Sequence, residues 1–558
     1  MHGKDSLMTM RLWQYQKEKL NQPDQAKVKD VFFNIEMPLE PILVDMFEYG
    51  VNINMDMLNQ LYKKYNTRLQ EAQKVVYDEI SKYNDEIEQY KLTHYNHKLD
   101  NPINIGSPVQ LSTLFYNILK YKTKSGKGTG VAELEEINTP LTRALLDYRK
   151  MSKLIDAFLV SLPKQIEPTT GKIHTSLNQY GAATGRFSSS SPNLQQIPSR
   201  GEAKEIRRIF GATKGYILMS SDFSQQEPRS LASLCKDPNM LNAYVTGKDL
   251  YATMASQIYK LPYEDCMEFY LDENGNKTDK TNPEGKKRRS NTKGILLGIM
   301  YGRGVASVAE VIHETKEDAQ KIIDSFYESY PKIREYTEYV QKQAIKNGYT
   351  ETAWGRRRYL PHIQDEKYEY HYNDRRPIDF NPLFTADTHI KEKVPQNVKD
   401  EYNKLLDRSN ITRKRQIIEQ AKQRGIDIID NEGFLADAMR QCLNSTIQGT
   451  AADITKRAMI SIGNNKELKD LGFKMLFPVH DEILAECPFE NRKRCGELLR
   501  QLMIDAAKPN ITCPMKTDVE YFFYWYGPDV NPDDTDITQK QYEDYLTTGV
   551  YKDEEYYQ

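Results

Sequence analysis

Two apolar segments, far apart in the chain, each end on an aspartate. YILMSSD ends at Asp222 and MLFPVHD ends at Asp481. Short apolar runs of this kind are typical of buried β-strands, so each acid is expected where a strand ends. An isolated aspartate in such a place commonly caps a turn. A functional role therefore needs further signals in the chain between them.

One such signal is the segment RRSNTKGILLGIMYG, which lies between the two strands. Arg289, Lys293, Leu297 and Tyr301 recur at every fourth position, so they occupy one slowly winding face of a helix. Gly302 follows as a helix stop. An arginine one turn before a lysine suits a triphosphate, because arginine binds it bidentately and lysine acts as a point charge. The alternative is a solvated basic helix face.

Two acids and a cationic helix are the parts that nucleotidyl transfer needs. Phosphoryl transfer depends on positioning and charge neutralisation more than on covalent help from the protein. Two magnesium ions about 4 Å apart can activate the attacking oxygen and stabilise the leaving group. Magnesium usually takes one or two carboxylates plus substrate phosphates. Asp222 and Asp481 are the predicted carboxylates.

The segments DFSQQEPR, RRSNTKGILLGIMYG and FPVHDEI, in this order, resemble the three polymerase motifs of the family A DNA polymerases. The likeness runs from about residue 5 to about residue 526, and three further segments carry it: HTSLNQYGAATGRFSSSSPNLQQIP, TAWGRRRYLP and RQCLNSTIQGTAADITK. The resemblance implies an α+β fold of right-hand shape, with an antiparallel palm sheet and helical fingers and thumb. It also implies a template-directed, DNA-dependent DNA polymerase that binds primer–template DNA and dNTPs and uses two Mg²⁺ ions.

The resemblance assigns roles around the nucleotide. Asp222, Asp481 and Phe223 would form the metal site, the two acids being catalytic. Glu227 would pack under the sugar and exclude a 2′-hydroxyl, which is discrimination by steric conflict. The phosphates and base of the nucleotide would be bound by Arg289, Lys293, Tyr301, Gln225, Tyr251 and Leu297.

The DNA-contacting residues implied by the resemblance fall in two segments and one isolated position. His480 stands beside Asp481, but magnesium does not prefer imidazole, so His480 is interpreted either as a residue that supports the metal ligands or as a strand residue, and the resemblance places it near the DNA. The helix RQCLNSTIQGTAADITK repeats polar residues at every fourth position, on one face. The complete set is Arg186, Asn193, Gln196, Arg440, Asn444, Gln448 and His480.

Four positions depart from the family pattern. Leu297 replaces a usual Phe or Tyr, which leaves sensitivity to chain terminators open. Tyr251 stands where the family usually has His, and could still donate a hydroxyl hydrogen bond to a phosphate. Pro228 and Pro478 replace a usual Leu and a common Gln, and neither change removes a metal ligand.

The first residues resemble the closing helix of a 3′–5′ exonuclease domain. Asp5 falls on the last of that domain's carboxylates, and the earlier ones have no counterpart here. A two-metal nuclease does not work with one acid, so this chain alone is not expected to proofread. Either the exonuclease was lost or a separate polypeptide supplies it, and the second explanation is favoured. A helix kept for packing is the remaining alternative.

Composition excludes some classes of protein. The 558-residue chain has a net charge of −2, so DNA binding must come from local positive surfaces such as 286–289 and 356–358. Six scattered cysteines with no C-x-x-C pair argue against a zinc site and for a reducing, cytoplasmic setting. No apolar run approaches the length of a membrane span, so no membrane contact is expected.

The chain is divided by this resemblance into consecutive regions. The 364–430 segment replaces a short family connection and is expected to be charged helix after an irregular stretch; it and the acidic tail are candidate contacts for a processivity or replisome partner. The regions are an exonuclease remnant (1–40), thumb (41–165), palm (166–245 and 431–526), fingers (246–361), insertion (364–430) and tail (527–558).

Two other functions remain open from the sequence. An RNA-synthesising relative is disfavoured by Glu227 and by the intact Tyr301–Gly302 pair. A catalytically silent DNA-binding subunit would be favoured by loss of either metal-binding acid, and both are present. The compact chain and divergent motifs favour a bacteriophage replicase acting in the host cytoplasm, with bacterial repair and organellar replication as alternatives.

Overall fold

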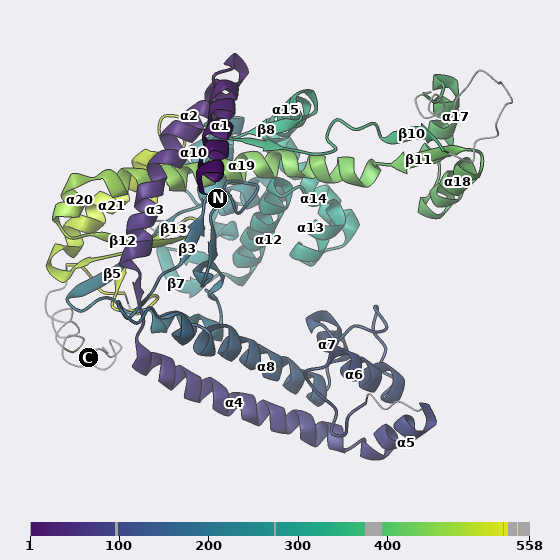
Figure 1. Cartoon of the computed structure of the whole chain (residues 1–558), viewed down its shortest axis with the longest axis horizontal. Helices are drawn as coiled ribbons and strands as arrows, with labels where there is room; N and C mark the ends of the chain where they lie inside the picture. Colours follow the sequence, from purple (N-terminus) through teal and green to yellow (C-terminus); the bar gives the residue numbers. More distant parts are fainter. Residues whose placement is uncertain are drawn as a thin grey trace.

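The computed structural model describes residues 2–94, 99–272, 275–373, 393–527, 529–533 and 544. Three parts extend from a region that holds the main β-sheet: a pair of long helices below it, a set of helices beside it, and a small α/β module at the far end of the long axis (Figure 1). Helices and strands alternate irregularly along the chain, and the described strand pairs are antiparallel. The α+β class predicted from the sequence is confirmed.

The main sheet has four antiparallel strands in the order β12-β13-β5-β14. Its strands are β5 (Tyr216–Phe223), β12 (Lys474–Val479), β13 (Glu482–Pro488) and β14 (Thr517–Phe522). Residues 217–221 of β5 are buried on both faces, which explains the continuous apolar run in the sequence. Helix α21 (Arg492–Ala506) packs against β5, β13 and β14. The main hydrophobic core surrounds this sheet.

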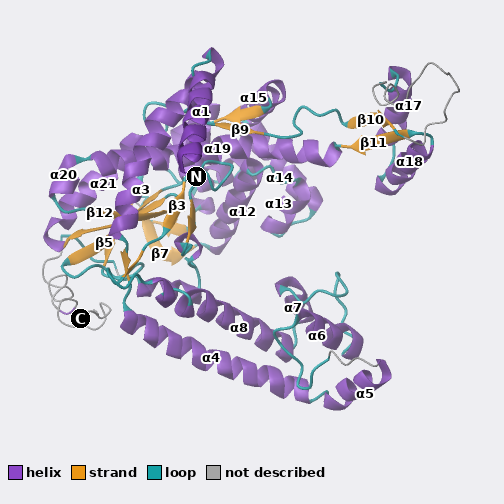
Figure 2. Ribbon diagram, in the orientation of Figure 1, coloured by secondary structure: helices purple, strands orange, loops and turns teal. Residues whose placement is uncertain are grey.

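Two long helices form the arm predicted as the thumb. Helix α4 (Met55–Ser81) packs along α8 (Pro140–Leu154), and both are drawn below the sheet in Figure 2. The far end of the arm has its own core around Val76, Phe115 and Leu145. Shorter helices close it: α5 (Asn84–His94), α6 (Pro108–Ser112) and α7 (Val131–Ile137).

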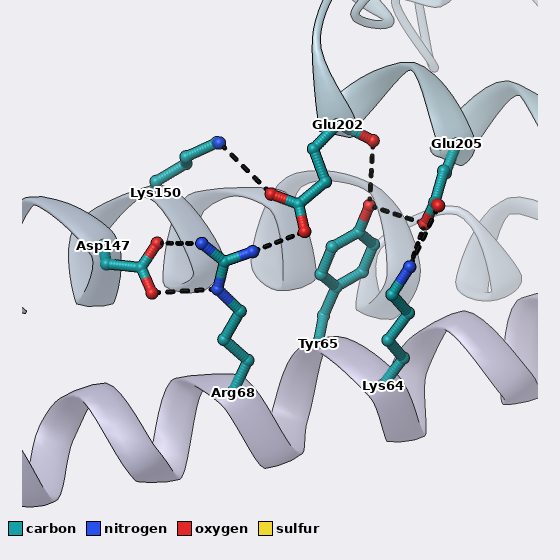
Figure 3. Close-up of polar contacts among 7 residues, drawn as sticks. All are labelled: Lys64, Tyr65, Arg68, Asp147, Lys150, Glu202 and Glu205. Carbon is teal, nitrogen blue, oxygen red and sulfur yellow. Dashed lines mark hydrogen bonds and ion pairs between the residues drawn. The ribbon is translucent and has the colours of Figure 1, made fainter.

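A polar cluster joins the base of this arm to the sheet region (Figure 3). Arg68 of α4 donates to both carboxylate oxygens of Asp147 on α8, at 2.6 and 2.9 Å, and also pairs with Glu202. Glu202 begins the 3₁₀ helix η7 (Glu202–Ile209). The buried Tyr65 donates to the Glu202 carbonyl at 3.2 Å and to Glu205 at 3.3 Å. One guanidinium therefore ties together three separate segments.

The region predicted as fingers is mainly helical. It contains α11 (Leu250–Tyr259), α12 (Pro283–Met300), α13 (Val305–Ile312), α14 (Lys316–Ser329) and α15 (Pro331–Asn347), and α10 (Pro238–Val245) precedes it at the end of the predicted palm segment. Its hairpins are β6 (Phe269–Leu271) with β7 (Lys277–Thr281) and β8 (Tyr349–Glu351) with β9 (Arg357–Tyr359). Gly302, at φ 64°, follows the end of α12 as the sequence predicts.

The inserted segment folds as a module with its own small core. Strands β10 (Tyr368–Tyr372) and β11 (Ile426–Asp430) pair antiparallel and pack with α17 (Gln396–Asp407) and α18 (Ile411–Gln423). The predicted charged helix is confirmed. The expectation of an irregular stretch before it is wrong for 368–372, because Tyr368 and Tyr370 bury their rings in the module's core. Residues 374–392 lie outside the described part.

Helix α19 (Glu432–Asn464) connects this module to the sheet region in 33 uninterrupted residues (Figure 1). Within it, the fully buried Asp453 pairs with Arg356, which also pairs with Glu36. Lys456 donates to Glu36 at 2.8 Å. The prediction that 356–358 forms a free positive surface is wrong for Arg356 and also for Arg357, which pairs with Glu351 at 3.0 Å.

The N-terminal part is helical. It contains α1 (His2–Leu20), α2 (Ala26–Val31) and α3 (Met37–Tyr49), and Asp5 lies on the exposed α1. Trp13 of α1 stacks on Phe32, with ring centroids 5.9 Å apart. Short pairs β1 (Val51–Asn52) with β2 (Lys172–Ile173) and β3 (Ser176–Asn178) with β4 (Ser188–Ser190) lead into the sheet region. The remaining helices are α9 (Gln226–Cys235) and α20 (Lys466–Asp470).

Among the residues that the structure describes, no helix is both long and apolar enough to traverse a bilayer. All six cysteines lie among these residues, buried and as free thiols. The predicted partner contact of the acidic tail falls mainly on 534–543 and 545–558, which lie outside the described part.

Replacing Arg68 by Met should lower the free energy of unfolding by about 1 kcal/mol, because it removes a bidentate pair that is partly exposed to water. Urea unfolding followed by circular dichroism would measure the change. Lys82→Met is the matched control, since Lys82 pairs with Glu79 three residues away on the same helix end and joins no other segment. Equal losses in both variants would contradict a joining role for Arg68.

Candidate active site

The two predicted metal-binding acids lie side by side. Asp222 is the second-last residue of β5, and Asp481 lies in the turn between β12 and β13. The register pairs Glu482 with Asp222, so Asp481 precedes the residue directly opposite Asp222. The Phe223 amide donates to the Asp481 carbonyl at 3.3 Å, and His480 makes the turn with φ 60°. The strand ends therefore bring together acids that are far apart in the sequence.

The position of the pair disfavours two negative charges. Burial, followed by the charge of Asp481, raises the pKa of Asp222 to about 8, and burial also raises the pKa of Asp481. Asp222 itself is exposed at the edge of the sheet while Asp481 is half-buried, so water moderates the effect at Asp222. Adjacent carboxylates that repel each other are what a divalent cation stabilises.

Phe223 contacts Asp481 through its backbone amide, and its ring is buried in the core. The described residues contain no group of three or more His, Cys, Asp or Glu side chains that could hold a metal ion. Asp222 and Asp481 offer hard carboxylate oxygens, the donor type that magnesium prefers.

A third acid, Glu482, which the sequence analysis missed, lies buried next to the turn and holds it in place. Glu482 is buried and accepts hydrogen bonds from Ser220 at 2.6 Å and from the Trp525 indole at 3.0 Å. Arg207, itself buried, lies 3.8 Å from the Glu482 carboxylate and stacks over Trp525. The acid in FPVHDEI was visible beside Asp481, but its partners come from distant segments.

Glu227 is held by two of the predicted site residues. It lies in the first turn of α9, where Tyr301 Oη donates to its Oε2 at 3.0 Å and Arg186 forms an ion pair with its Oε1. Burial raises the pKa of Glu227, and it raises that of Tyr301 to about 12. Gln448 lies close enough to Tyr301 to lower the pKa of its hydroxyl, and Arg186 lines a small cavity with His480. These five residues come from five different segments.

The cationic face of α12 is confirmed as helical, but its arginine is already engaged. Arg289 donates to both oxygens of Asp249 at 2.9–3.1 Å, and its guanidinium lies 5.5 Å from the Tyr251 ring. Lys293 is exposed and lies 5.8 Å from the same ring. Leu297 is half-buried against the main core. Asp249 was missed because its sequence signal is that of a helix cap, which it also is.

The remaining predicted residues have simpler surroundings. Gln225 adopts φ 55° and accepts a hydrogen bond from Tyr244 at 2.9 Å. Asn193 caps a short helix through the Gln195 amide, whereas Gln196 is exposed. Arg440 is exposed, pairs with Asp437, and packs its backbone against Gly302, where an added Cβ would lie 2.7 Å from it. Asn444 is half-buried on the same helix.

An antiparallel sheet with paired acids at its strand ends, flanked by a cationic helix and a two-helix arm, is the arrangement that the resemblance to right-hand polymerases predicts. The sequence profile of DNA polymerase family A matches residues 66–378 and 389–527. The chain belongs to this family.

Its relatives are bacterial DNA polymerases. The chain is 29% identical to DNA polymerase I of Pseudomonas aeruginosa over 93% of its own length and 46% of the relative's. For DNA polymerase I of Treponema pallidum the identity is 30%, over 94% and 42%. The chain thus spans about half the length of the curated relatives that it matches. A solved POL domain of Pol1 from M. smegmatis, in complex with DNA primer-template and dNTP, superimposes with a TM-score of 0.64 at 28% identity, over 89% of this chain and 71% of that one.

Without metal, the stability of the fold should fall as the pH rises. An acid whose pKa is raised by folding stabilises the folded state while it is protonated, and this contribution is lost as the pH rises from its ordinary value of 3.8 through about 8. Melting temperatures in a chelator, from about pH 5 to about pH 9, would measure the fall. Asp222→Asn should flatten it.

The control for this experiment is Asp518→Asn. Asp518 lies directly opposite Asp222 on β14, but it is exposed and pairs with Lys516 at 3.3 Å. If both substitutions flatten the dependence of melting temperature on pH, or if neither does, the adjacency of Asp222 and Asp481 is not what makes their ionisation costly.

Proposed function

We propose that this chain is a template-directed DNA polymerase that adds deoxynucleotides to a primer 3′-hydroxyl. The observation that carries the proposal is the adjacency of Asp222 and Asp481 at the strand ends, with the Glu227–Tyr301–Arg186 cluster nearby. Membership of DNA polymerase family A and the likeness to a domain solved with DNA primer-template and dNTP support it. The proposed substrates are primer–template DNA and dNTPs.

Asp222 and Asp481 would hold two magnesium ions. The ions would neutralise charge on the primer oxygen and the leaving pyrophosphate. The two carboxylates fit this role because a cation bound between them would offset the repulsion of their like charges. The backbone of Phe223 would complete the protein side of the metal site.

Arg289 and Lys293 would bind the triphosphate from α12. Arg289 already makes a bidentate contact with the Asp249 carboxylate, a geometry that it can repeat on a phosphate. Lys293 is exposed and would add a point charge one turn later. Tyr251, Gln225 and Leu297 would line the same pocket.

The DNA-facing residues would contact the nascent base pair and the DNA next to it. Tyr301 would sit near the templating base, and Gln448 of α19 lies close to the Tyr301 side chain. Arg440 and Asn444 extend that helix face, while Arg186 and His480 lie together on the palm side. Asn193 and Gln196 would contact DNA from the segment before the sheet.

The exposed face of α1 is proposed to contact a 3′–5′ exonuclease unit. Leu7, Met8, Met10, Leu12 and Tyr15 are each 46–61% exposed on this helix, which resembles the last helix of such a domain. The purified chain alone should therefore leave a mismatched primer end unshortened.

Extension of a labelled primer with magnesium and dNTPs tests the polymerase proposal. Asp222→Ala or Asp481→Ala should slow extension by about a thousandfold or more, since each removes a metal-binding group worth several kcal/mol at the transition state. Asp470→Asn, an exposed acid at the end of α20, is the control. DNA binding without extension by the unaltered chain would instead favour a silent subunit.

Glu227→Ala should relax the choice of sugar. Removing the anchored side chain opens space under the sugar, and ribonucleotide use should rise by about tenfold to a hundredfold relative to deoxynucleotides. Parallel extensions with each nucleotide set would measure the ratio. An unchanged ratio would contradict the steric role, and preference for ribonucleotides by the unaltered chain would indicate an RNA-synthesising enzyme.

A further inference from the structure

The inserted module has an unusual excess of free positive charge on α18 and its C-terminal cap. Residues 411–424 carry five cations and one acid, which are Arg413, Lys414, Arg415, Lys422 and Arg424 against Glu419. The buried side of α18 is formed by Ile417 and Ala421. Four of the five cations are exposed, the exception being Lys414. The helix therefore turns a basic surface toward solvent.

Among the described residues, the exposed cations of α18 have no carboxylate partner. Arg415, Lys422 and Arg424 make no ion pair within the described part of the chain, and Arg413 bonds only the neutral Gln416 there. The cations of α12 differ, because Lys286, Lys287 and Arg289 each pair with an acid. Unneutralised cations on one short helix are suited to a polyanion.

The basic surface adjoins an exposed aromatic pair at the start of α19. Lys414 of α18 and Lys367 both pair with Glu432, the first residue of α19. Two residues further on, Phe434 stacks on His362, with ring centroids 4.9 Å apart. Phe434 is 54% exposed and the His362 side chain 49%. Aromatic faces beside cations are the means by which proteins bind single-stranded nucleic acid.

Helix α19 aligns this aromatic pair with the candidate active site. Phe434, Gln441 and Gln448 are seven residues apart, so they lie on nearly the same face of the helix. Fourteen residues of helix separate Phe434 from Gln448 by about 21 Å. Two nearby acids are paired with cations, Asp437 with Arg440 and Glu432 with the two lysines, while Asp365 Oδ2 lies 2.6 Å from His362 Nδ1. A strand that leaves the site along α19 would meet the aromatic pair and then α18.

We propose that Phe434, His362 and the cations of α18 form a second DNA site that binds the single-stranded template beyond the templating base. The inference rests on the proposed polymerase function for the identity of the strand. The chemistry of the site itself requires only single-stranded DNA, with phosphates on the arginines and lysine and bases on the aromatic pair. A protein partner for the same surface is an outcome of the test.

Fluorescence anisotropy with labelled primer–templates tests the site without requiring extension. The probes are one duplex with a 5′ template overhang of about 3 nucleotides and one with about 20, so only the second reaches the module. Replacing Arg413, Arg415, Lys422 and Arg424 by Ser should weaken binding of the long-overhang probe at least tenfold and leave the short one unchanged. The dependence of affinity on salt should also become shallower for the long probe.

Phe434→Ala tests stacking separately from charge. It should weaken the long-overhang complex by about tenfold without changing the salt slope, because stacking on an aromatic ring releases no counterions. The charge-matched control replaces four exposed cations at the opposite end of the molecule: Lys466, Lys469, Lys493 and Arg494.

The outcomes separate this inference from the polymerase proposal. Overhang-dependent binding that requires α18 supports the second site even in a chain that fails to extend a primer. Equal affinity of the unaltered chain for both probes, or equal loss in the α18 and control variants, would overturn it. Loss of binding to both probes with intact melting temperature would overturn it too, since the surface would then act on the duplex. Overhang-independent binding together with capture of a defined protein by α18 would assign the surface to a protein partner instead.

Discussion

The pairing of β5 with β13 is the constraint on which the rest of the site depends. The two strands are far apart in the sequence, and their register puts Glu482 opposite Asp222 and so brings Asp481 beside it. A slip of one residue would turn Asp222 to the other face of the sheet. The slip would break the buried hydrogen bonds that Glu482 accepts from Ser220 and Trp525, which fixes the register. A costly pair of carboxylates is held together by packing that has no part in the chemistry.

Local patterns in the sequence predicted much of this arrangement. The apolar runs before Asp222 and Asp481, the fourfold spacing along α12 and the stop at Gly302 all reflect interactions within a few residues, and the structure agrees with them. The partners of Arg289 and Arg356 were not predicted. Each is an acid from another segment, and ion pairing of that kind depends on tertiary proximity, which a single sequence does not encode in its spacing. The strand at 368–372 was missed for a similar reason, since its partner lies more than fifty residues later.

Several groups in the site are satisfied by the protein itself. Arg289 is bound to Asp249, and Glu227 is bound by Tyr301 and Arg186. A triphosphate at Arg289 must therefore exchange with a carboxylate, so its net binding energy is the difference between two charge-assisted contacts. Arg289 would therefore bind whichever of the two groups, the triphosphate or the Asp249 carboxylate, has the more negative charge and the better hydrogen-bond geometry. The contact with Asp249 also keeps buried polar groups paired before any substrate arrives.

Helix α19 is a single continuous helix that connects the inserted module to the candidate active site. Its 33 residues begin in the inserted module and pass Gln448 before they reach the sheet region. Because each residue of an α-helix turns by about 100°, deleting one residue between Phe434 and Gln448 would swing the whole module around the helix axis by that angle. The number of residues between Phe434 and Gln448 therefore sets the rotation of the module about the helix axis more than its distance from the candidate active site. Only changes that approximate whole turns, such as seven residues, would preserve the direction in which the module faces.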